Sequence, residues 1–360
     1  MISIIIPTYN EKANIPVLTQ RIRGVLHGES YEVIFVDDST DDTPAVLEAV
    51  SRQYPEFRSI HRDRERGLAT AVILGFQAAK GEILAVMDAD LQHPPELLTE
   101  MLAHIQRGAD LVLPSRFLNG CGDQGLRWHR KIIAKTARLV SQLALQRVRK
   151  VSDPMSGFFM LRRHVLRGID WNPIGWKILM EILVKGHYTN VVEIPYQFCE
   201  RFGNKSKMSL REQWNYLRHV YRLVVSSPED RRLFLFLLVG LSGVLVNLLV
   251  FDFLYAIAGF SALWAGFCSA LVAMTSNFML HDTFTWPGDK QGYAFIRYLK
   301  YVLISTVGIG INLLTLYLLH SRFGLNPLLA NAIGIAVATG WNFGMNSIWT
   351  WREALRHVRI

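Results

Sequence analysis

The sequence predicts an α/β domain with a mostly parallel sheet, followed by an all-α domain of four membrane-spanning helices. Short β-rich runs alternate with amphipathic helical segments in the first half of the chain, which is typical of a parallel sheet with helices on both faces. From about residue 233 to residue 349 the chain is mostly apolar and carries few charges. The hydrophobic fraction of 50% excludes a disordered or fibrous protein.

The sheet is expected to form from five β-rich runs. They are Ile2–Ile6, Glu32–Val36, Arg58–His61, Ile83–Met87 and Asp110–Leu113. In such sheets ligands bind beyond the carboxyl ends of the strands, so the residues that follow each run are the candidates for function. No G-x-G-x-x-G and no G-x-x-x-x-G-K-S/T motif follows a run, which disfavours a dinucleotide-binding domain and a P-loop NTPase.

The residues at the strand ends are rich in oxygen ligands. The second run is followed by Asp37 and Asp38, and the fourth by Asp88, Asp90 and Gln92. Two carboxylates and an amide suit Mg²⁺ or Mn²⁺ that bridges a diphosphate. An acidic loop after a strand is often only a turn or a helix cap, but its place after a central strand, beside a second acidic strand end, favours a metal site.

For other residues near these strand ends, the sequence predicts a structural role or leaves two roles open. His93 precedes Pro94 and Pro95, which fix the turn that starts the next helix, so a structural role is expected for His93. Residues 41–43 are expected to form a turn and a helix cap. Asp153, in the sequence D-P-M-S-G, either caps a helix or orients an arginine.

The second half of the chain contains four apolar stretches that approach the roughly 20 residues needed to cross a bilayer. They are Leu233–Leu254, Ser261–His281, Tyr298–Leu319 and Pro327–Ile348, with buried core helices as the alternative. Basic residues precede the first stretch, separate the second from the third and follow the fourth. The positive-inside rule therefore predicts a multi-pass membrane protein with both termini and the first domain on the cytosolic side.

The apolar half also contains an internal repeat. Gly243 and Asn277 recur as Gly308 and Asn342, each with an offset of 65 residues. Two helices in each copy give both copies the same orientation, which predicts a pseudo-twofold axis along the membrane normal. Asparagines are costly when they face lipid, so these are expected to bond between helices.

The chain has an excess of positive charge, with 39 Lys and Arg against 30 Asp and Glu. This excess suits anionic lipid head groups and phosphorylated substrates, whereas nucleic acid is disfavoured because no recognised binding module accompanies the charge. Two basic amphipathic segments, about residues 127–143 and Trp214–Val225, stand out. Each either lies in the membrane interface or packs on the core with a solvated basic face.

The motifs of the first half occur in the order seen in glycosyltransferase family 2, and over about residues 1–210 they most resemble the polyprenyl (dolichyl) phosphate mannose synthases. They are P-T-Y-N-E, V-D-D-S-T-D-D-T, R-G-L-A-T-A, M-D-A-D-L-Q-H-P-P-E, S-R-F, D-P-M-S-G-F-F and R-F-G-N-K-S-K-M. The resemblance implies a GT-A fold and transfer of a sugar from a nucleotide donor to a membrane polyprenyl phosphate.

The four stretches are similar to the GtrA-like family of four-helix membrane domains, over about Leu233–Arg352. Together the two resemblances imply a GT-A domain over residues 1–210, an amphipathic interface helix or linker over 211–232, and a transmembrane domain of two tandem helix pairs over 233–352.

The resemblance also implies roles for individual residues. The donor nucleotide is expected to contact Pro7, Tyr9, Glu11, Val36, Asp38, Asp88, Ala89 and Lys177. A divalent Mg²⁺ or Mn²⁺ is expected on Asp88, Asp90 and Gln92. The expected catalytic residues are Asp90, Arg201 and Lys207. The positively charged side chains of Arg201 and Lys207 are expected to bind donor or acceptor phosphates.

One loop departs from the family pattern R-x-x-G-x-S-K. Gly203 comes one place early and Asn204 takes the glycine position, where Asn is the non-glycine residue that best tolerates a left-handed backbone. If the first basic segment lies in the membrane interface, Arg116 and Arg130 are the residues expected to bind the acceptor phosphate.

The expected reaction is inverting transfer of mannose from GDP-mannose to polyprenyl phosphate. A phosphate monoester has a second pKa of about 6, so its oxygen is mostly an unprotonated nucleophile at neutral pH and needs positioning more than a general base. Glucose from UDP-glucose is the alternative within this class. A nucleotide-sensing membrane scaffold or lipid translocator is the alternative from another class.

Overall fold

The core of the first half is a seven-stranded sheet with the strand order β3-β2-β1-β4-β6-β5-β7. The strands are β1 (Ile2–Thr8), β2 (Tyr31–Asp37), β3 (Phe57–His61), β4 (Ile83–Val86), β5 (Leu111–Ser115), β6 (Phe159–Arg162) and β7 (Val191–Pro195). β6 runs antiparallel to β4 and β5, and every other pair is parallel. The predicted fold class, an α/β domain with a mostly parallel sheet, is confirmed.

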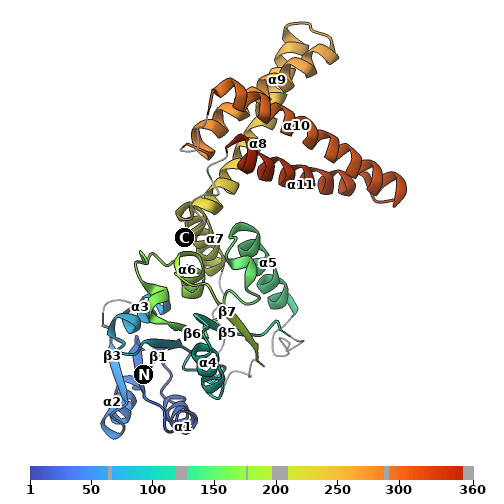
Figure 1. Cartoon of the computed structure of the whole chain (residues 1–360). Coiled ribbons are helices and arrows are strands. Elements are labelled where there is room, and N and C mark those ends of the chain that lie inside the picture. Colours follow the sequence, from blue (N-terminus) through green and yellow to red (C-terminus); the bar gives the residue numbers. More distant parts are fainter. Residues whose placement is uncertain (64–66, 119–127, 176, 197–209, 288–291, 352–360) are drawn as a thin grey trace. The chain divides into compact units, whose positions relative to one another are not determined.

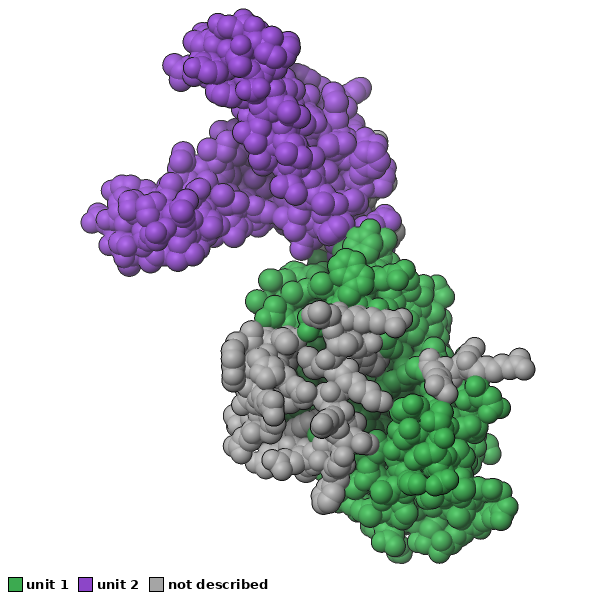
Figure 2. Space-filling view, turned by 180° about the vertical axis from the view of Figure 1, so that it is seen from behind, with its two compact units in different colours: residues 1–227 green, residues 228–360 purple. Residues whose placement is uncertain are grey.

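The structure is a computed structural model, and it describes the chain except residues 64–66, 119–127, 176, 197–209, 288–291 and 352–360; side chains are also left out at 128–134, 210–212 and 229. The chain forms two compact units, Met1–Ser227 and Pro228–Ile360, which Figure 2 shows in green and purple. Each unit is described by itself below.

The helices of the first unit pack on the sheet or extend from it. They are α1 (Ile15–Val25), α2 (Thr43–Gln53), α3 (Leu68–Ala78), α4 (Leu97–Gln106), α5 (Trp128–Ala144), α6 (Ile178–Lys185) and α7 (Leu210–Ser226) (Figure 1), with 3-10 turns at Val148–Lys150 and Arg163–Leu166. Central strands such as β1 and β2 are buried almost throughout, as expected for parallel strands covered on both faces. Helix α3 approaches β1 closely, because a Cβ on Gly75 would lie 2.3 Å from the side chain of Ile5.

Parallel pairing brings the ends of four strands to one edge of the sheet. β1 pairs with β2 and β4, and β2 pairs with β3, all in the same direction. The ladder continues past the strand ends, because the amide of Asp38 donates to the carbonyl of Thr8 and that of Arg62 donates to the carbonyl of Asp37. The loops after β1, β2, β3 and β4 therefore meet at this edge.

Among its described residues, the second unit contains four helices that are long and apolar enough to cross a membrane. They are α8 (Pro228–Asp252), α9 (Ala262–Leu280), α10 (Ala294–Tyr317) and α11 (Pro327–Met345), each continued by a short π-helical turn, at Phe253–Ile257, His281–Thr285, Leu318–Arg322 and Asn346–Thr350. α8 packs against α9, and α10 packs against α11. The four apolar stretches of the sequence fall on these helices.

The 65-residue repeat is visible as repeated contacts. Gly243 faces Asn277, and Gly308 faces Asn342; a Cβ on either glycine would lie within 2.4 Å of the asparagine side chain. Trp286 and Trp351, which are also 65 residues apart, stack on each other with ring centroids at 4.2 Å and planes 6° apart. Equivalent residues of the two copies thus contact each other, as residues close to a twofold axis would.

Candidate functional site

A cavity of about 310 Å³ opens where the loops after β1, β2 and β3 meet the start of α3. Its lining residues are Pro7, Thr8, Tyr9, Asp38, Gly67, Leu68 and Ala71. Three residues predicted for the donor nucleotide, Pro7, Tyr9 and Asp38, therefore share one cavity. Val36 is fully buried within β2, beneath this edge.

Arg62, which follows β3, holds the carboxylate of Asp38 in the wall of this cavity. Its Nε donates to Oδ1 at 2.7 Å and its Nη2 donates to Oδ2 at 2.6 Å, with both side chains less than a tenth exposed. The amide of Gly67 donates to the same Oδ2 at 3.0 Å, and Arg62 Nη2 donates back to the carbonyl of Gly67. Asp38 thus holds Gly67 in place at the start of α3, and both residues line the cavity.

Arg62 was not among the residues singled out from the sequence. Gly67 has a φ of +144°, a conformation that side-chain-bearing residues rarely adopt, and it lies in the R-G-L-A-T-A motif. The signal that points to Arg62 is its position directly after a third strand that ends at the same edge. Local pattern alone does not reveal that its partner is Asp38.

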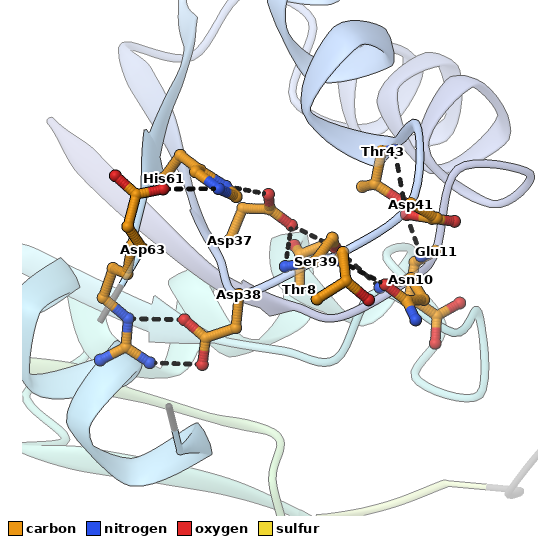
Figure 3. A network of polar contacts seen from close by, with 12 residues as sticks. Thr8, Asn10, Glu11, Asp37, Asp38, Ser39, Asp41, Thr43, His61 and Asp63 are labelled. Atoms are coloured by element: carbon orange, nitrogen blue, oxygen red, sulfur yellow. Dashed lines mark hydrogen bonds and ion pairs between the residues drawn. The ribbon is translucent and has the colours of Figure 1, made fainter. Parts of the chain in front are cut away.

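A second polar network ties the loops after β1, β2 and β3 together, and Figure 3 shows it from close by. Asp37 is fully buried, and its Oδ2 lies 2.7 Å from Nδ1 of His61. The hydroxyl of Ser39 donates to Oδ1 of Asp37 and accepts from the amide of Asn10 at 2.7 Å. Because a buried carboxylate needs such partners, this network sets the relative positions of the three loops.

Residues 41–43 form the turn expected for them, but the N-cap residue of α2, Asp42, makes no side-chain capping bond. The amide of Thr43 donates to Oδ1 of Asp41 at 3.0 Å, and the hydroxyl of Thr43 accepts from the amide of Glu11 at 3.1 Å (Figure 3). The Glu11 carboxylate accepts from the side-chain amide of Asn14. Glu11 thus lies at the same edge as the cavity but is not among its lining residues.

The loop after β4 carries the predicted metal ligands. Asp90 is buried, Asp88 has 35% of its side chain exposed, and Ala89 between them is buried. The loop reverses at Leu91, whose φ of +63° is unusual for a residue with a branched side chain. The amide of Gln92 donates to Oδ1 of Asp90 at 3.1 Å, which stabilises this reversal.

The donor set of this loop fits a divalent cation that binds together with a diphosphate. Asp88, Asp90 and Gln92 offer hard oxygen atoms of the kind that Mg²⁺ and Mn²⁺ prefer. Within the described part of the chain, no three His, Cys, Asp or Glu side chains converge to form a complete protein cage. Mg²⁺ is usually bound by one or two carboxylates and completed by substrate phosphates and water, which is the arrangement that this loop can supply.

His93 closes the loop from behind. Its Nδ1 accepts the amide N–H of Asp88 at 3.1 Å, and its ring stacks on Phe158 with centroids 5.1 Å apart. The residue is only 3% exposed, and burial lowers the pKa of His93 to about 4, so that the ring is neutral at physiological pH. The structural role expected for His93 therefore includes a direct bond to the candidate metal loop.

Arg116, which follows β5, is held by Asp153. Its Nε donates to Oδ2 at 2.7 Å and its Nη2 donates to Oδ1 at 3.1 Å, while Asp153 is fully buried. Of the two roles that the sequence left open for Asp153, the structure shows the orientation of an arginine. The same D-P-M-S-G segment reaches the metal loop, because a Cβ on Gly157 would lie 3.2 Å from the carboxylate of Asp88.

Not every predicted site residue can be placed. Lys177 is the residue that precedes the first turn of α6. Arg130 belongs to α5, but its side chain lies outside the described part of the structure. Arg201 and Lys207 both lie outside the described residues, and so does the loop that departs from the family pattern. The roles predicted for these cations stay predictions.

Helix α7 has an apolar stripe on its exposed side. Trp214, Leu217, Tyr221 and Val225 are all exposed, Trp214 by 69%. The opposite side packs on the domain, where Nε2 of the fully buried His219 lies 3.2 Å from Oε2 of Glu181 in α6. Of the two alternatives that the sequence left open, the structure shows that the helix packs on the core. Its position in the membrane interface stays a prediction, which the exposed apolar stripe supports.

Both units match families of known proteins. Residues 3–169 match the family described as Glycosyl transferase family 2, and residues 235–351 match the GtrA/DPMS transmembrane domain. A dolichol-phosphate mannosyltransferase of Pyrococcus furiosus is 40% identical, over 97% of this chain and 99% of its own length. One of Saccharomyces cerevisiae is 36% identical over 65% of this chain and 91% of its own length. A polyprenol monophosphomannose synthase of Mycolicibacterium smegmatis is 32% identical, with 57% and 80% covered.

Proposed function

The chain belongs to glycosyl transferase family 2 and carries a GtrA/DPMS transmembrane domain, and from this premise we propose that it transfers mannose from GDP-mannose to a polyprenyl phosphate in the membrane. It is a glycosyltransferase and a multi-pass membrane protein. The observation that carries the proposal is the 40% identity to a dolichol-phosphate mannosyltransferase across both units. The product is then a polyprenyl phosphate mannose.

The donor is proposed to bind at the carboxyl edge of the sheet. The nucleoside occupies the cavity between Tyr9 and Asp38, and the diphosphate extends toward Asp88 and Asp90, which follow the neighbouring strand β4. The Asp38 carboxylate is already fixed by Arg62, so little reorganisation is needed when the nucleoside binds. A divalent ion on Asp88, Asp90 and Gln92 would supply charge stabilisation for the departing nucleoside diphosphate.

The acceptor phosphate is proposed to bind at Arg116. Asp153 accepts hydrogen bonds from Nε and Nη2 of this guanidinium, and we propose that the guanidinium oriented in this way contacts the lipid phosphate. One oxygen of the lipid phosphate forms a bond to the anomeric carbon of mannose as the bond from that carbon to the diphosphate breaks. The electron pair leaves with the nucleoside diphosphate, and in-line attack inverts the anomeric configuration.

The orientation in the membrane is also a proposal. Arg231 and Arg232 lie at the start of the first span and Arg297 and Lys300 at the start of the third, and the turns at the other ends are poor in basic residues. The positive-inside rule then places the glycosyltransferase unit and both termini on the cytosolic side. Nucleotide sugars dissolved in the cytosol would reach the donor cavity directly.

The proposal is tested by offering both donors to the full chain. Purified protein in vesicles with a polyprenyl phosphate receives radiolabelled GDP-mannose or UDP-glucose, and label is measured in the organic phase. We expect label from GDP-mannose only, and none after the Asp90→Ala substitution. Label from UDP-glucose would identify the alternative synthase, and no label from either donor would favour the scaffold or translocator.

A further inference from the structure

The loop after β4 has a conformation that its own sequence does not favour. Leu91 adopts a φ of +63°, which costs free energy for a residue with a side chain, so neighbouring contacts must hold it. One such contact is the bond from the Gln92 amide to Asp90. A second contact joins the two ends of the loop, because the amide of Asp88 donates to Nδ1 of His93 at 3.1 Å.

Burial and contacts with neighbouring residues hold the His93 ring in one position. It is 3% exposed, it stacks on Phe158 at an interplanar angle of 24°, and Cε1 would lie 3.4 Å from a Cβ added at Gly157. The ring therefore has little freedom to move away from the Asp88 amide. A nitrogen that accepts this N–H must carry a lone pair, which fixes the tautomer with the proton on Nε2.

We propose that His93 is a positioning residue that holds the Asp88–Gln92 loop in its metal-binding conformation through the bond between its Nδ1 and the amide of Asp88. The inference rests on the proposed function, because it presumes that the loop binds a divalent cation with the donor diphosphate. His93 acts through the backbone of Asp88, at the first residue of the ligand set. Without an acceptor at this place a buried N–H would lose its partner and the loop would relax toward other conformations.

Two substitutions that introduce side chains of nearly equal shape distinguish the effect of this hydrogen bond from the effect of packing. His93→Asn keeps an acceptor oxygen close to the place of Nδ1, whereas His93→Leu has a similar branched shape and no acceptor. His93→Phe keeps the ring that stacks on Phe158 but also lacks the acceptor. Gly157→Ala keeps the imidazole of His93, but its new Cβ would press on the Asp88 carboxylate at 3.2 Å and contact the His93 ring at 3.4 Å.

The measurement is binding of Mn²⁺ to the full chain in detergent, in the presence of GDP, by titration calorimetry, with thermal unfolding as the check of folding. We expect His93→Asn to bind Mn²⁺ within about threefold of the unsubstituted chain, and His93→Leu and His93→Phe to bind about tenfold more weakly or worse. Gly157→Ala is expected to weaken binding while the fold is kept. The KM for the donor should follow the same order.

Any of four results would overturn the inference. Equal Mn²⁺ affinity of folded His93→Leu and the unsubstituted chain would show that the bond is not needed. Equal loss in His93→Asn and His93→Leu would show that only the shape of the ring matters. Failure of the unsubstituted chain to bind Mn²⁺ with GDP would remove the metal site of the proposed function, and the role of His93 with it. If neither His93→Leu nor His93→Phe folds, unchanged binding in Gly157→Ala would argue against a loop whose exact position matters.

Discussion

The side chains of the candidate site are fixed mostly by other side chains from distant parts of the sequence. Asp38 is held by Arg62, and Arg116 is held by Asp153, in each case by two hydrogen bonds between guanidinium and carboxylate. Such paired bonds define the orientation of both groups as well as their distance. In the proposed reaction, the pair of Asp38 and Arg62 would prepare the site for the donor, and the pair of Arg116 and Asp153 would prepare it for the acceptor.

Loss of Arg62 is expected to damage donor binding and stability together. Arg62→Met leaves the Asp38 carboxylate buried without its partner, which typically costs about 3 kcal/mol or more, and frees the Gly67 loop. We expect a KM for GDP-mannose at least about tenfold higher, with a smaller change in the KM for the lipid, and a lower unfolding temperature. The control is Arg52→Met, whose exposed pair with Glu48 contributes little; a normal donor KM in Arg62→Met would contradict the assignment.

Loss of charge at Asp153 is expected to affect the acceptor instead. Asp153→Asn keeps the shape of the side chain but weakens both bonds to Arg116, so the guanidinium is less well oriented. Steady-state rates should show the KM for polyprenyl phosphate rising about tenfold while the KM for the donor changes little. Asp42→Asn, at an exposed pair with Lys12, serves as the control. A rise confined to the donor KM would assign Arg116 to the other substrate.

Among the elements, the helices of the second unit depend on close contacts at small residues. Gly243 in α8 faces Asn277 of α9, and the 65-residue repeat places Gly308 and Asn342 in the same relation. Asn247 in α8 accepts from the hydroxyl of Ser269 in α9 at 3.0 Å. Small residues and amide side chains are the usual means by which helices associate in a bilayer, where apolar burial gives no net drive.

A methyl group at one of these glycines is expected to separate the helices. In Gly243→Ala the new Cβ would lie 2.3 Å from the side-chain amide of Asn277, so the helix or the asparagine must move. Overpacking of this kind costs about 1–3 kcal/mol. Gly240→Ala, one turn earlier in α8 and with no atom within 4 Å of the new Cβ, is the matched control.

Thermal unfolding of the purified chain in detergent measures the difference between the two glycine variants. We expect a lower unfolding temperature for Gly243→Ala, and an unchanged or slightly higher one for Gly240→Ala because alanine favours helix. Equal unfolding temperatures would mean that the contact between Gly243 and Asn277 does not support the unit.

The sequence predicted the elements whose pattern is local and missed those that depend on distant pairing. Buried parallel strands such as β1 and β2 form continuous apolar runs, and the four spans are long enough to be recognised by composition. β6 is only four residues long, Phe159–Arg162, and is a strand because it inserts antiparallel between β4 and β5. β7 likewise exists through its pairing with β5. Arg62 was missed for the same reason, since its partner Asp38 follows a different strand.

For the whole molecule, the two units divide the work that the proposed reaction requires. The first holds polar chemistry at the carboxyl edge of a sheet, and the second supplies four apolar helices among which large side chains such as Leu249 and Leu263 are exposed. The proposed reaction joins a soluble nucleotide sugar to a membrane lipid, and the chain contains one unit suited to each of these environments. The two units could be predicted from the family motifs in the sequence. The ion pairs that orient the site could be found only in the structure.

Removal of divalent cations is expected to stop the reaction without unfolding the protein. The Asp88–Gln92 loop contributes two carboxylates and one amide, and its conformation is maintained by bonds within the chain. Excess EDTA should therefore abolish transfer to the lipid while the unfolding temperature of the chain stays nearly constant. Added Mn²⁺ or Mg²⁺ should restore transfer. Full activity in EDTA would exclude an essential metal.

The central claim is that the donor and a divalent cation bind together at the carboxyl edge of the sheet, at the carboxylates of Asp88 and Asp90. Crystals of the full chain grown with GDP-mannose and Mn²⁺ test it most directly, by anomalous diffraction at the manganese edge. The account predicts one peak within about 2.5 Å of oxygen atoms of Asp88, Asp90 and Gln92 and of the diphosphate, with guanine in the cavity beside Tyr9. A nucleotide bound outside that cavity, or a diphosphate with no manganese at this loop, would contradict it.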